Sequence, residues 1–341
     1  MERISKHDTH QLLRVGLTYN LKKNEKSDVV DNEAEYDNIE TVMAIKKALE
    51  DEHCQVELME ADEELPSKLA NHTVDIVFNI AEGIQGRGRE AQVPALLNYY
   101  KIPFTGSDET TLCVALDKAL SKRVLATYHI KTPKYRIISK NDQKLNGNFS
   151  FPAIVKPNAE GSSKGISDVA IVADLQELRG LVTKNIGMYH QDMLVEEYIP
   201  GREFTVGIVG NGEDIKVFPP MEIVYKKPKK YNIYSYNVKQ NYKELIGYES
   251  PAKVKAETET EMINTARKIY KILDCKDFSR IDFRLSDDGK LYFIEINPLP
   301  GLAPGYSDFP MLAEFNGTDY VTLVRSVLSH ALKRYGLNYY I

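Results

Sequence analysis

The chain has few features that would place it outside the ordinary class of globular proteins. Its cysteines number only three and lie far apart, at Cys54, Cys113 and Cys275, without a CxxC pair or a histidine at metal-ligand spacing. We therefore expect buried, reduced thiols rather than disulfides or a zinc site. No apolar run approaches the roughly 18 residues of a membrane-spanning helix. The charged N-terminus does not resemble a signal peptide, so the sequence predicts a cytoplasmic protein.

An excess of positive charge is also missing. The formal net charge is −5, whereas surfaces that bind DNA or RNA usually carry a clear basic excess. The composition argues against a nucleic-acid partner and against a membrane partner. With 341 residues, 43% of them hydrophobic, the chain is long enough for two or three domains.

The first third of the chain alternates short strands with helices, which predicts a small parallel sheet with flanking helices. Apolar runs indicate strands at 13–19, 55–60 and 74–80, and helical spacing indicates helices at about 39–49 and 90–100. One longer helix is predicted over about 111–128. We place the boundary of an N-terminal α/β domain at residues 1–115.

The remaining chain is predicted to form an α+β unit at 116–200 and a C-terminal domain at 201–341. The second unit contains strands near 151–157 and 193–199 and a helix that Asp174 can cap. The third contains helices near 256–273 and 318–335 and a hairpin at 280–297. Residues 225–243 are rich in tyrosine and lysine and lack periodicity, so we expect a mobile, functional loop.

The hairpin at 280–297 is the most informative segment. Because strand residues alternate between faces, Asp282 on the first strand and Glu295 and Asn297 on the second can share one side. Two carboxylates and an amide offer the oxygen ligands that Mg²⁺ takes together with phosphate and water. The alternative is a solvated, charged hairpin face. An apolar run around Glu295 and Asn297 weakens that alternative, since buried polar groups need partners.

A glycine- and serine-rich loop at 156–165 follows a predicted strand. Its small residues would let backbone N–H groups approach phosphate oxygens, and Lys156 at the strand end could neutralise them. It lacks the GxxxxGK[ST] spacing of a Walker A loop, and a plain turn remains an alternative. Lys118 is equally compatible with a solvated helix position. The strand edge at 196–199 could pair with an adenine ring, with Glu203 nearby.

In their order along the chain, Lys118, VKPNAEGSSKG, VEEYIPGREFTV and RIDFR…FIEINPLPG resemble the ATP-grasp superfamily, and within it the D-alanine–D-alanine ligase group. The resemblance implies an ATP-grasp fold preceded by a small parallel-sheet domain. It also implies a homodimer that acts on small-molecule carboxylate and amine substrates. The implied enzyme uses ATP with Mg²⁺ or Mn²⁺ to activate a carboxylate as an acyl phosphate, joins it to an amine, and releases ADP and phosphate.

The resemblance also implies roles for individual residues. Asp282, Glu295 and Asn297 would hold the metal, Arg280 would stabilise the tetrahedral intermediate, and Lys239 would close over the γ-phosphate. The implied nucleotide-binding residues are Lys118, Lys156, Glu160, Glu196, Glu197, Tyr198, Ile199 and Glu203. Ser162, Ser163 and Gly165 would form a lid that touches both phosphate and substrate.

The substrate-binding segments depart from the family pattern. The first strand continues into Thr18–Lys23 without the family's HGG-type loop and its nearby glutamate, and Gln240 stands where a tyrosine is expected. We therefore expect amino acids other than D-alanine, with a D-alanine–D-alanine ligase as the alternative. A non-amino-acid carboxylate substrate and an ATP-binding sensor without turnover also remain open. The expected substrate residues are Glu82, Arg87, Arg89, Gly301, Ser307 and Asp308. Glu82 could replace the absent anion, Arg87 and Arg89 could bind an extra carboxylate on the donor, and Asp308 could favour an acceptor with an extra hydrogen-bond donor.

Overall fold

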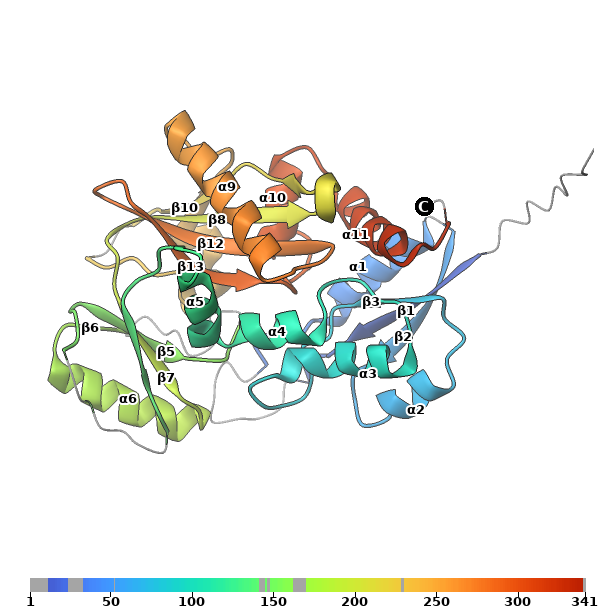
Figure 1. Cartoon of the computed structure of the whole chain (residues 1–341), viewed down its shortest axis with the longest axis horizontal. Coiled ribbons are helices and arrows are strands. Elements are labelled where there is room, and N and C mark those ends of the chain that lie inside the picture. The colour runs from blue at the N-terminus through green and yellow to red at the C-terminus, as the bar shows by residue number, and fades with distance from the viewer. Residues whose placement is uncertain are drawn as a thin grey trace, which may run out of the picture.

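The computed structural model describes residues 12–23, 33–51, 53–140, 145, 148–161, 170–227 and 230–339. This part of the chain forms three sheets, arranged as three neighbouring bodies (Figure 1). The N-terminal sheet lies at one end of the molecule. A four-stranded sheet and a six-stranded sheet lie at the other end, and two consecutive helices connect the three bodies. The predicted combination of α/β and α+β architecture is confirmed.

The N-terminal sheet is parallel, with strand order β2-β1-β3. Its strands are β1 (Leu13–Tyr19), β2 (Cys54–Glu60) and β3 (Ile76–Asn79), and its helices are α1 (Ile39–Glu50), α2 (Leu65–Ala70), the 3₁₀ helix η1 (Arg89–Ala91) and α3 (Gln92–Tyr100). Parallel pairing requires crossover connections, and α1 provides the one between β1 and β2. One apolar cluster continues from β1 and α1 into the C-terminal helix α11 (Tyr320–Tyr335), so the two chain ends share a core.

The single helix expected over 111–128 is instead two helices, α4 (Glu109–Leu116) and α5 (Lys118–Ala126). The backbone breaks at Asp117, where ψ is 95°. Oδ1 of Asp117 accepts hydrogen bonds from the N–H of Leu120 (2.9 Å) and from Nδ2 of Asn158 (2.7 Å). This cap stabilises the new helix start and fixes Lys118 in its first turn.

The four-stranded sheet has the order β4-β7-β5-β6 and is covered by one helix. Its elements are β4 (Tyr135–Ile138), β5 (Ala153–Pro157), β6 (Ile171–Val172), α6 (Leu175–Tyr189) and β7 (Met193–Glu197). The predicted cap at Asp174 is confirmed, because its Oδ1 accepts from the N–H groups of Gln176 and Glu177. Ser162, Ser163 and Gly165 lie outside the described residues.

The six-stranded sheet is antiparallel and has the order β11-β10-β8-β12-β13, with β9 paired to β8. Its strands are β8 (Gly201–Val209), β9 (Lys216–Val217), β10 (Met221–Tyr225), β11 (Ile246–Glu249), β12 (Phe278–Ser286) and β13 (Leu291–Asn297). The helices of this region are η2 (Gly212–Asp214), α7 (Tyr236–Gln240), α8 (Tyr242–Leu245), α9 (Ala256–Ile272), α10 (Asp308–Phe315) and α11. The segment expected to be an aperiodic loop therefore carries α7 and the start of α8. Val238 and Tyr234 pack there against Ile246.

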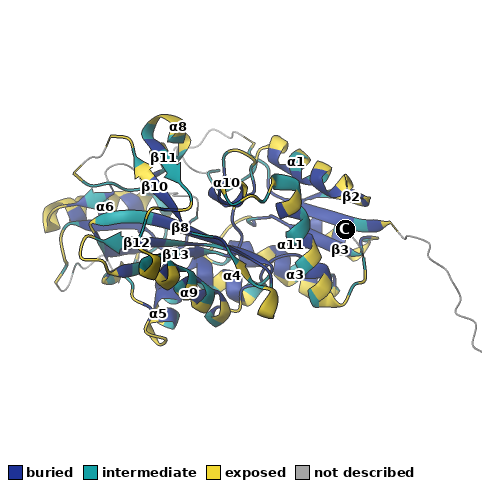
Figure 2. Ribbon diagram, turned by 90° about the horizontal axis from the view of Figure 1, so that it is seen from above, coloured by how far each residue is buried: buried dark blue, intermediate teal, exposed yellow. Residues whose placement is uncertain are grey.

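Figure 2 shows β8, β12 and β13 as mainly buried strands, whereas exposed residues gather on the outer turns of α6 and α9. The three cysteines are free thiols, and Cys54 and Cys275 are buried as expected. Cys113 differs from the expectation, because it lies on the exposed side of α4. Within the described ranges, no helix is both long and apolar enough to cross a membrane.

Candidate active site

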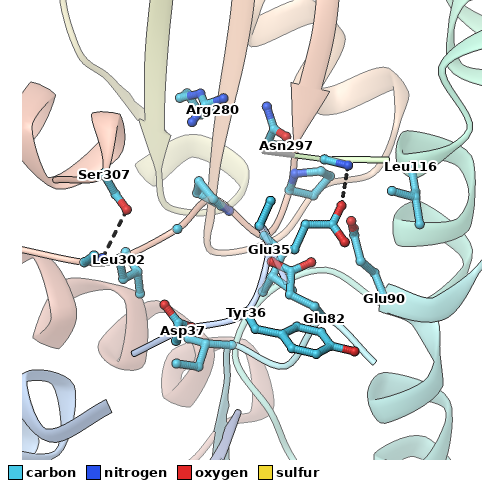
Figure 3. A pocket seen from close by; sticks show the side chains of 18 of the residues that line it. Glu35, Tyr36, Asp37, Glu82, Glu90, Leu116, Arg280, Asn297, Leu302 and Ser307 are labelled. Atoms are coloured by element: carbon cyan, nitrogen blue, oxygen red, sulfur yellow. Dashed lines mark hydrogen bonds between the residues drawn. The ribbon is translucent and has the colours of Figure 1, made fainter. Parts of the chain in front are cut away.

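One cavity is bordered by residues of all three bodies (Figure 3). Its lining residues include Glu35, Glu82, Lys118, Glu160, Lys239, Arg280, Glu295, Asn297, Gly301 and Ser307. A second cavity adjoins it and shares Lys239, Arg280 and Glu295. Most of the residues singled out in the sequence therefore converge on one continuous region.

The hairpin presents its polar residues as the alternation predicts. In the β12–β13 register, Asp282 lies opposite Glu295 and Arg280 lies opposite Asn297, with a β-bulge directly after Asp282. Oδ1 of Asp282 accepts hydrogen bonds from Thr205 Oγ1 (2.7 Å) and Arg280 Nε (3.1 Å). These contacts hold the carboxylate at the cavity edge.

The charge state of Glu295 suits a metal ligand. Burial alone would raise the pKa of this carboxyl, but the charges of Lys118, Lys156 and Arg280 outweigh it and lower the pKa to about 2. Glu295 is therefore ionised at neutral pH. An ionised carboxylate opposite Asp282 and beside the Asn297 amide matches the hard oxygen ligands of Mg²⁺, so the residues present fit this metal.

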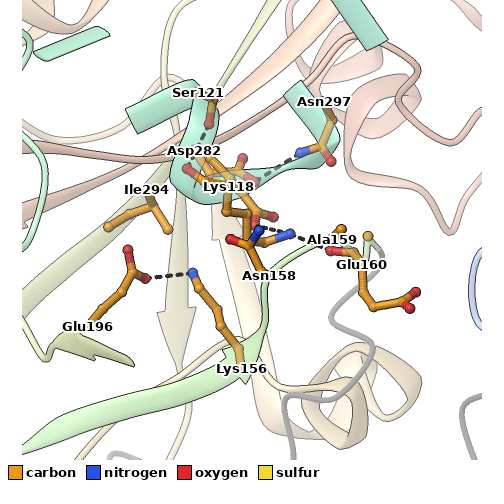
Figure 4. A network of polar contacts seen from close by, with 12 residues as sticks. Lys118, Ser121, Lys156, Asn158, Ala159, Glu160, Glu196, Asp282, Ile294 and Asn297 are labelled. Atoms are coloured by element: carbon orange, nitrogen blue, oxygen red, sulfur yellow. Dashed lines mark hydrogen bonds and ion pairs between the residues drawn. The ribbon is translucent and has the colours of Figure 1, made fainter. Parts of the chain in front are cut away.

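Two lysines lie on the side of the cavity that faces the four-stranded sheet (Figure 4), and a third, Lys122, contacts Glu196 behind them. Lys118 is buried, forms an ion pair of 3.5 Å with Glu295 and donates to the backbone oxygen of Glu160. Nζ of Lys156 lies 2.7 Å from Glu196. The negative charge of the Glu196 carboxylate outweighs the effect of burial and raises the pKa of Lys156.

Sequence reasoning missed the third lysine, Lys122. It is 0% exposed and forms an ion pair of 2.8 Å with Glu196. Burial lowers the pKa of Lys122 to about 8. The available signal was its spacing of four residues from Lys118, which places both lysines on one face of α5.

The second cavity matches the predicted nucleotide pocket in part. Glu196, Glu197, Ile199 and Glu203 line it, together with Ile154, Ile223 and Ile294. Tyr198 is not among the residues that line this cavity. The Tyr198 hydroxyl instead donates to the Asn232 backbone oxygen (3.1 Å), and its ring stacks on the guanidinium of Arg284. Oε2 of Glu203 accepts a hydrogen bond of 2.9 Å from Tyr225.

Each of the two arginines expected to bind a substrate carboxylate lies beside carboxylates of the protein itself. The side chain of Arg87 is 76% exposed and lies 3.6 Å from Asp117. Arg89 is buried, and its guanidinium contacts Glu35 at 2.5 Å and Glu160 at 3.0 Å. Two carboxylates of the protein therefore already engage the guanidinium of Arg89.

Sequence analysis also missed a glutamate on the segment that follows the first strand. Glu35 precedes α1 and reaches the cavity, where it contacts Arg89 and accepts from the N–H of Gly161. Glu82 lines the same wall as expected, and Glu90 of η1 joins it. The signal for Glu35 was weak, since it lies in a polar stretch without periodicity. Its position just before a predicted helix was the only indication.

On the opposite wall, Gly301 and Ser307 line the cavity as expected. Oγ of Ser307 accepts a hydrogen bond of 3.2 Å from the N–H of Ala303. The side chain of Asp308 is only 2% exposed and turns into the adjoining cavity, where it bonds Tyr234 and faces Arg280 at 3.5 Å. Direct contact with an acceptor is therefore not its position.

Known proteins share both the sequence and the fold. The family described as D-ala D-ala ligase C-terminus matches residues 124–329. A D-alanine–D-alanine ligase of Aquifex aeolicus is 34% identical over 293 residues, which cover 86% of this chain and 94% of that protein. The uncharacterized protein y4sG of Sinorhizobium fredii is 33% identical, with 79% of this chain and 78% of that protein covered.

Among solved structures, a D-alanine–D-alanine ligase from Bacillus anthracis complexed with ATP superposes with a TM-score of 0.73. The alignment covers 95% of this chain and 98% of that one at 22% identity, which supports the fold. The sequence relatives and the family match show, in addition, the family of the chain. This chain belongs to the D-alanine–D-alanine ligase family of ATP-grasp enzymes, which are ATP-dependent ligases that form C–N bonds.

Proposed function

We propose that this protein joins the carboxylate of one amino acid to the amine of another through an acyl phosphate, and releases ADP and phosphate. The observation that carries the proposal is the convergence of Asp282, Glu295 and Asn297 with Arg280 and the buried lysines on one cavity. Relatives named D-alanine–D-alanine ligase support D-alanine as the reference substrate, and favour it over the other amino acids expected from the sequence.

ATP binding is the first requirement. Lys118 and Lys156 offer positive charge to the phosphates, and Glu197, Ile199 and Glu203 offer a pocket for the nucleoside. Asp282, Glu295 and Asn297 would hold Mg²⁺, which neutralises phosphate charge during phosphoryl transfer. The three proposed units, 1–115, 116–200 and 201–341, would each contribute one wall of the site.

The two chemical steps require no covalent intermediate with the protein. A donor carboxylate oxygen attacks the γ-phosphorus, and the bond to ADP breaks. The acceptor amine then attacks the acyl carbon, loses a proton, and phosphate leaves with the bonding electron pair. Arg280 lines both cavities and would stabilise the oxyanion of this second step.

Water must be excluded, since it would hydrolyse the acyl phosphate. The segment with α7 is suited to this task. It places the half-buried Lys239 against both cavities, and Tyr234 hydrogen-bonds to Asp308. A closed segment of this kind retains the intermediate until the amine reacts.

The proposal is tested by measuring nucleotide products with the purified protein, Mg-ATP and a panel of D- and L-amino acids. We expect ADP and phosphate in equal amounts, together with a dipeptide, and D-alanine among the substrates. AMP as the main product would contradict the mechanism. The absence of turnover across amino acids and simple carboxylates would favour an ATP-binding sensor.

A further inference from the structure

The wall of the cavity that lies away from Arg280 carries an unusual number of carboxylates. Asp37 and Glu35 precede α1, Glu82 follows β3, and Glu90 belongs to η1, yet all four side chains reach the same cavity (Figure 3). In this view Glu35 lies between Asn297 and Glu82, and Asp37 and Glu82 form the far end.

Nearby cations do not balance these charges. The guanidinium of Arg89 is shared between Glu35 and Glu160, and Lys118 pairs with Glu295. Lys22 also lines the cavity, where its charge acts on Asp37. Among the described residues, no cation forms an ion pair with Glu82 or Glu90.

Glu90 is the clearest case of a carboxylate that lacks a partner. It is 8% exposed, and its side chain points into the cavity (Figure 3). In the described ranges, no group donates a hydrogen bond to the side chain of Glu82 or Glu90, and no cation lies within 4 Å of either. A buried carboxylate without a partner is costly, so the buried Glu90 beside the half-buried Glu82 indicates a ligand that supplies positive charge.

The pKa shifts of Glu82 and Glu90 agree with this geometry. Burial raises the pKa of Glu90 to about 7, and the charge of Glu35 adds to the effect. Burial, followed by the charge of Glu90, raises the pKa of Glu82 well above its usual range. Burial and the neighbouring carboxylates outweigh the charges of Arg89 and Lys118, which lower the pKa of Glu90, and a bound organic cation would favour the ionised form of both groups.

A metal ion fits this wall poorly. In the described part of the chain, no three acidic, histidine or cysteine side chains are grouped closely enough to hold one. An organic cation places fewer demands on geometry, because an ammonium or guanidinium group donates several hydrogen bonds in different directions. The ligand chemistry is therefore that of a charged amine or guanidine.

We propose that Glu82 and Glu90 bind a positively charged group on the side chain of a donor amino acid, so that among donors with long side chains the enzyme uses cationic ones in preference to neutral ones of the same length. The inference rests on the proposed function. In Figure 3 Glu35 lies nearer to Asn297 than Glu82 does, so the two carboxylates occupy different depths of the cavity. A preference for a positively charged donor is opposite to the expectation from the sequence, in which Arg87 and Arg89 bind an extra carboxylate on the donor.

The test compares donors of equal size that differ in charge. D-ornithine and D-norleucine have side chains of the same length, and only the first ends in an ammonium group. Each is supplied with D-alanine and Mg-ATP, and the same pair is run with the L-enantiomers. The dipeptide is sequenced by mass spectrometry, because the donor becomes its N-terminal residue. We expect kcat/KM for the cationic donor to exceed that for the neutral donor by about tenfold or more, since a site built for a polar group rejects an analogue that lacks it.

The variants Glu82→Gln and Glu90→Gln should each reduce this ratio by about tenfold, because each removes one anion from the pocket. Glu57→Gln is the matched control, since Glu57 is exposed on β2 and outside the cavity lining, and its ratio should equal that of the unmodified protein. Circular dichroism checks that each variant is folded.

The outcomes separate the two proposals. A ratio near one in the unmodified protein overturns the inference, whatever the variants do, and leaves the proposed function standing if D-alanyl dipeptides form. A ratio that survives in both glutamine variants also overturns it. If no amino acid pair releases ADP, the proposed function fails and the inference fails with it.

Discussion

The hydroxyl of Tyr234 donates a hydrogen bond of 3.0 Å to Oδ1 of Asp308. The same oxygen lies 3.1 Å from the hydroxyl of Tyr248, and Oδ2 lies 3.5 Å from Arg280. One buried carboxylate at the start of α10 thus joins the segment that carries Lys239 to the arginine of the hairpin. We conclude that Asp308 positions active-site groups rather than substrate.

This arrangement predicts the effect of Tyr234→Phe. The change removes one hydrogen bond to a charged acceptor, worth about 1.5–3 kcal/mol, and loosens the segment over the site. We expect kcat to fall by about tenfold while KM for ATP changes less, as measured by ADP release. Tyr99→Phe is the control, because Tyr99 is exposed on α3. Equal kcat values for the two variants would show that the Tyr234–Asp308 bond does not support turnover.

Two substitutions in the hairpin test the metal site. Asp282→Asn and Glu295→Gln each remove one anionic ligand, and a metal that bridges phosphates contributes several kcal/mol in the transition state. We expect turnover to fall by about tenfold or more in each at saturating Mg²⁺, with unchanged circular dichroism.

Asp288→Asn serves as the control for these variants, because Asp288 lies in the exposed turn of the same hairpin. Its activity should match that of the unmodified protein. Near-normal activity in Asp282→Asn or Glu295→Gln would mean that the hairpin does not bind the metal.

The raised pKa of Glu90 predicts a pH-dependent stability. With a pKa of about 7 in the folded protein and an ordinary value near 4.5 when unfolded, the folded state binds more protons between these limits. The contribution of Glu90 to the free energy of unfolding therefore falls as the pH rises from about 5 to 7. Relative to the unmodified protein, Glu90→Gln should become more stable across this range.

Urea unfolding at pH 5.5 and pH 7.5 measures this difference. The comparison between the two proteins cancels the contributions of other groups that they share, apart from those of the neighbouring Glu82, Glu35, Arg89, Lys118 and Glu160. A stability difference that does not change with pH would show that Glu90 titrates near its ordinary value.

Local patterns were sufficient to predict the hairpin. Alternation fixes which side chains of one strand share a face, but the β-bulge after Asp282 shifts the register by one residue, so the pairing of Asp282 with Glu295 needed the structure. The strands β1 and β2 and the helices α1 and α9 were predicted because their apolar periodicity is continuous.

Features that depend on distant contacts could not be predicted in this way. The helix break at Asp117 depends on Asn158, which lies in another body of the molecule. Glu35 becomes a cavity residue because Arg89 holds it, and Tyr198 leaves the nucleotide pocket because Asn232 accepts its hydroxyl. In each case a side chain from a remote segment decides the position.

The central claim, that the donor carboxylate is activated by phosphorylation, is tested most directly with a donor labelled by ¹⁸O in its carboxylate. The attacking oxygen remains on phosphorus when the amine displaces phosphate. The account therefore predicts one ¹⁸O atom in the inorganic phosphate for each dipeptide formed, as measured by mass spectrometry. Unlabelled phosphate, or label found in AMP, would contradict it.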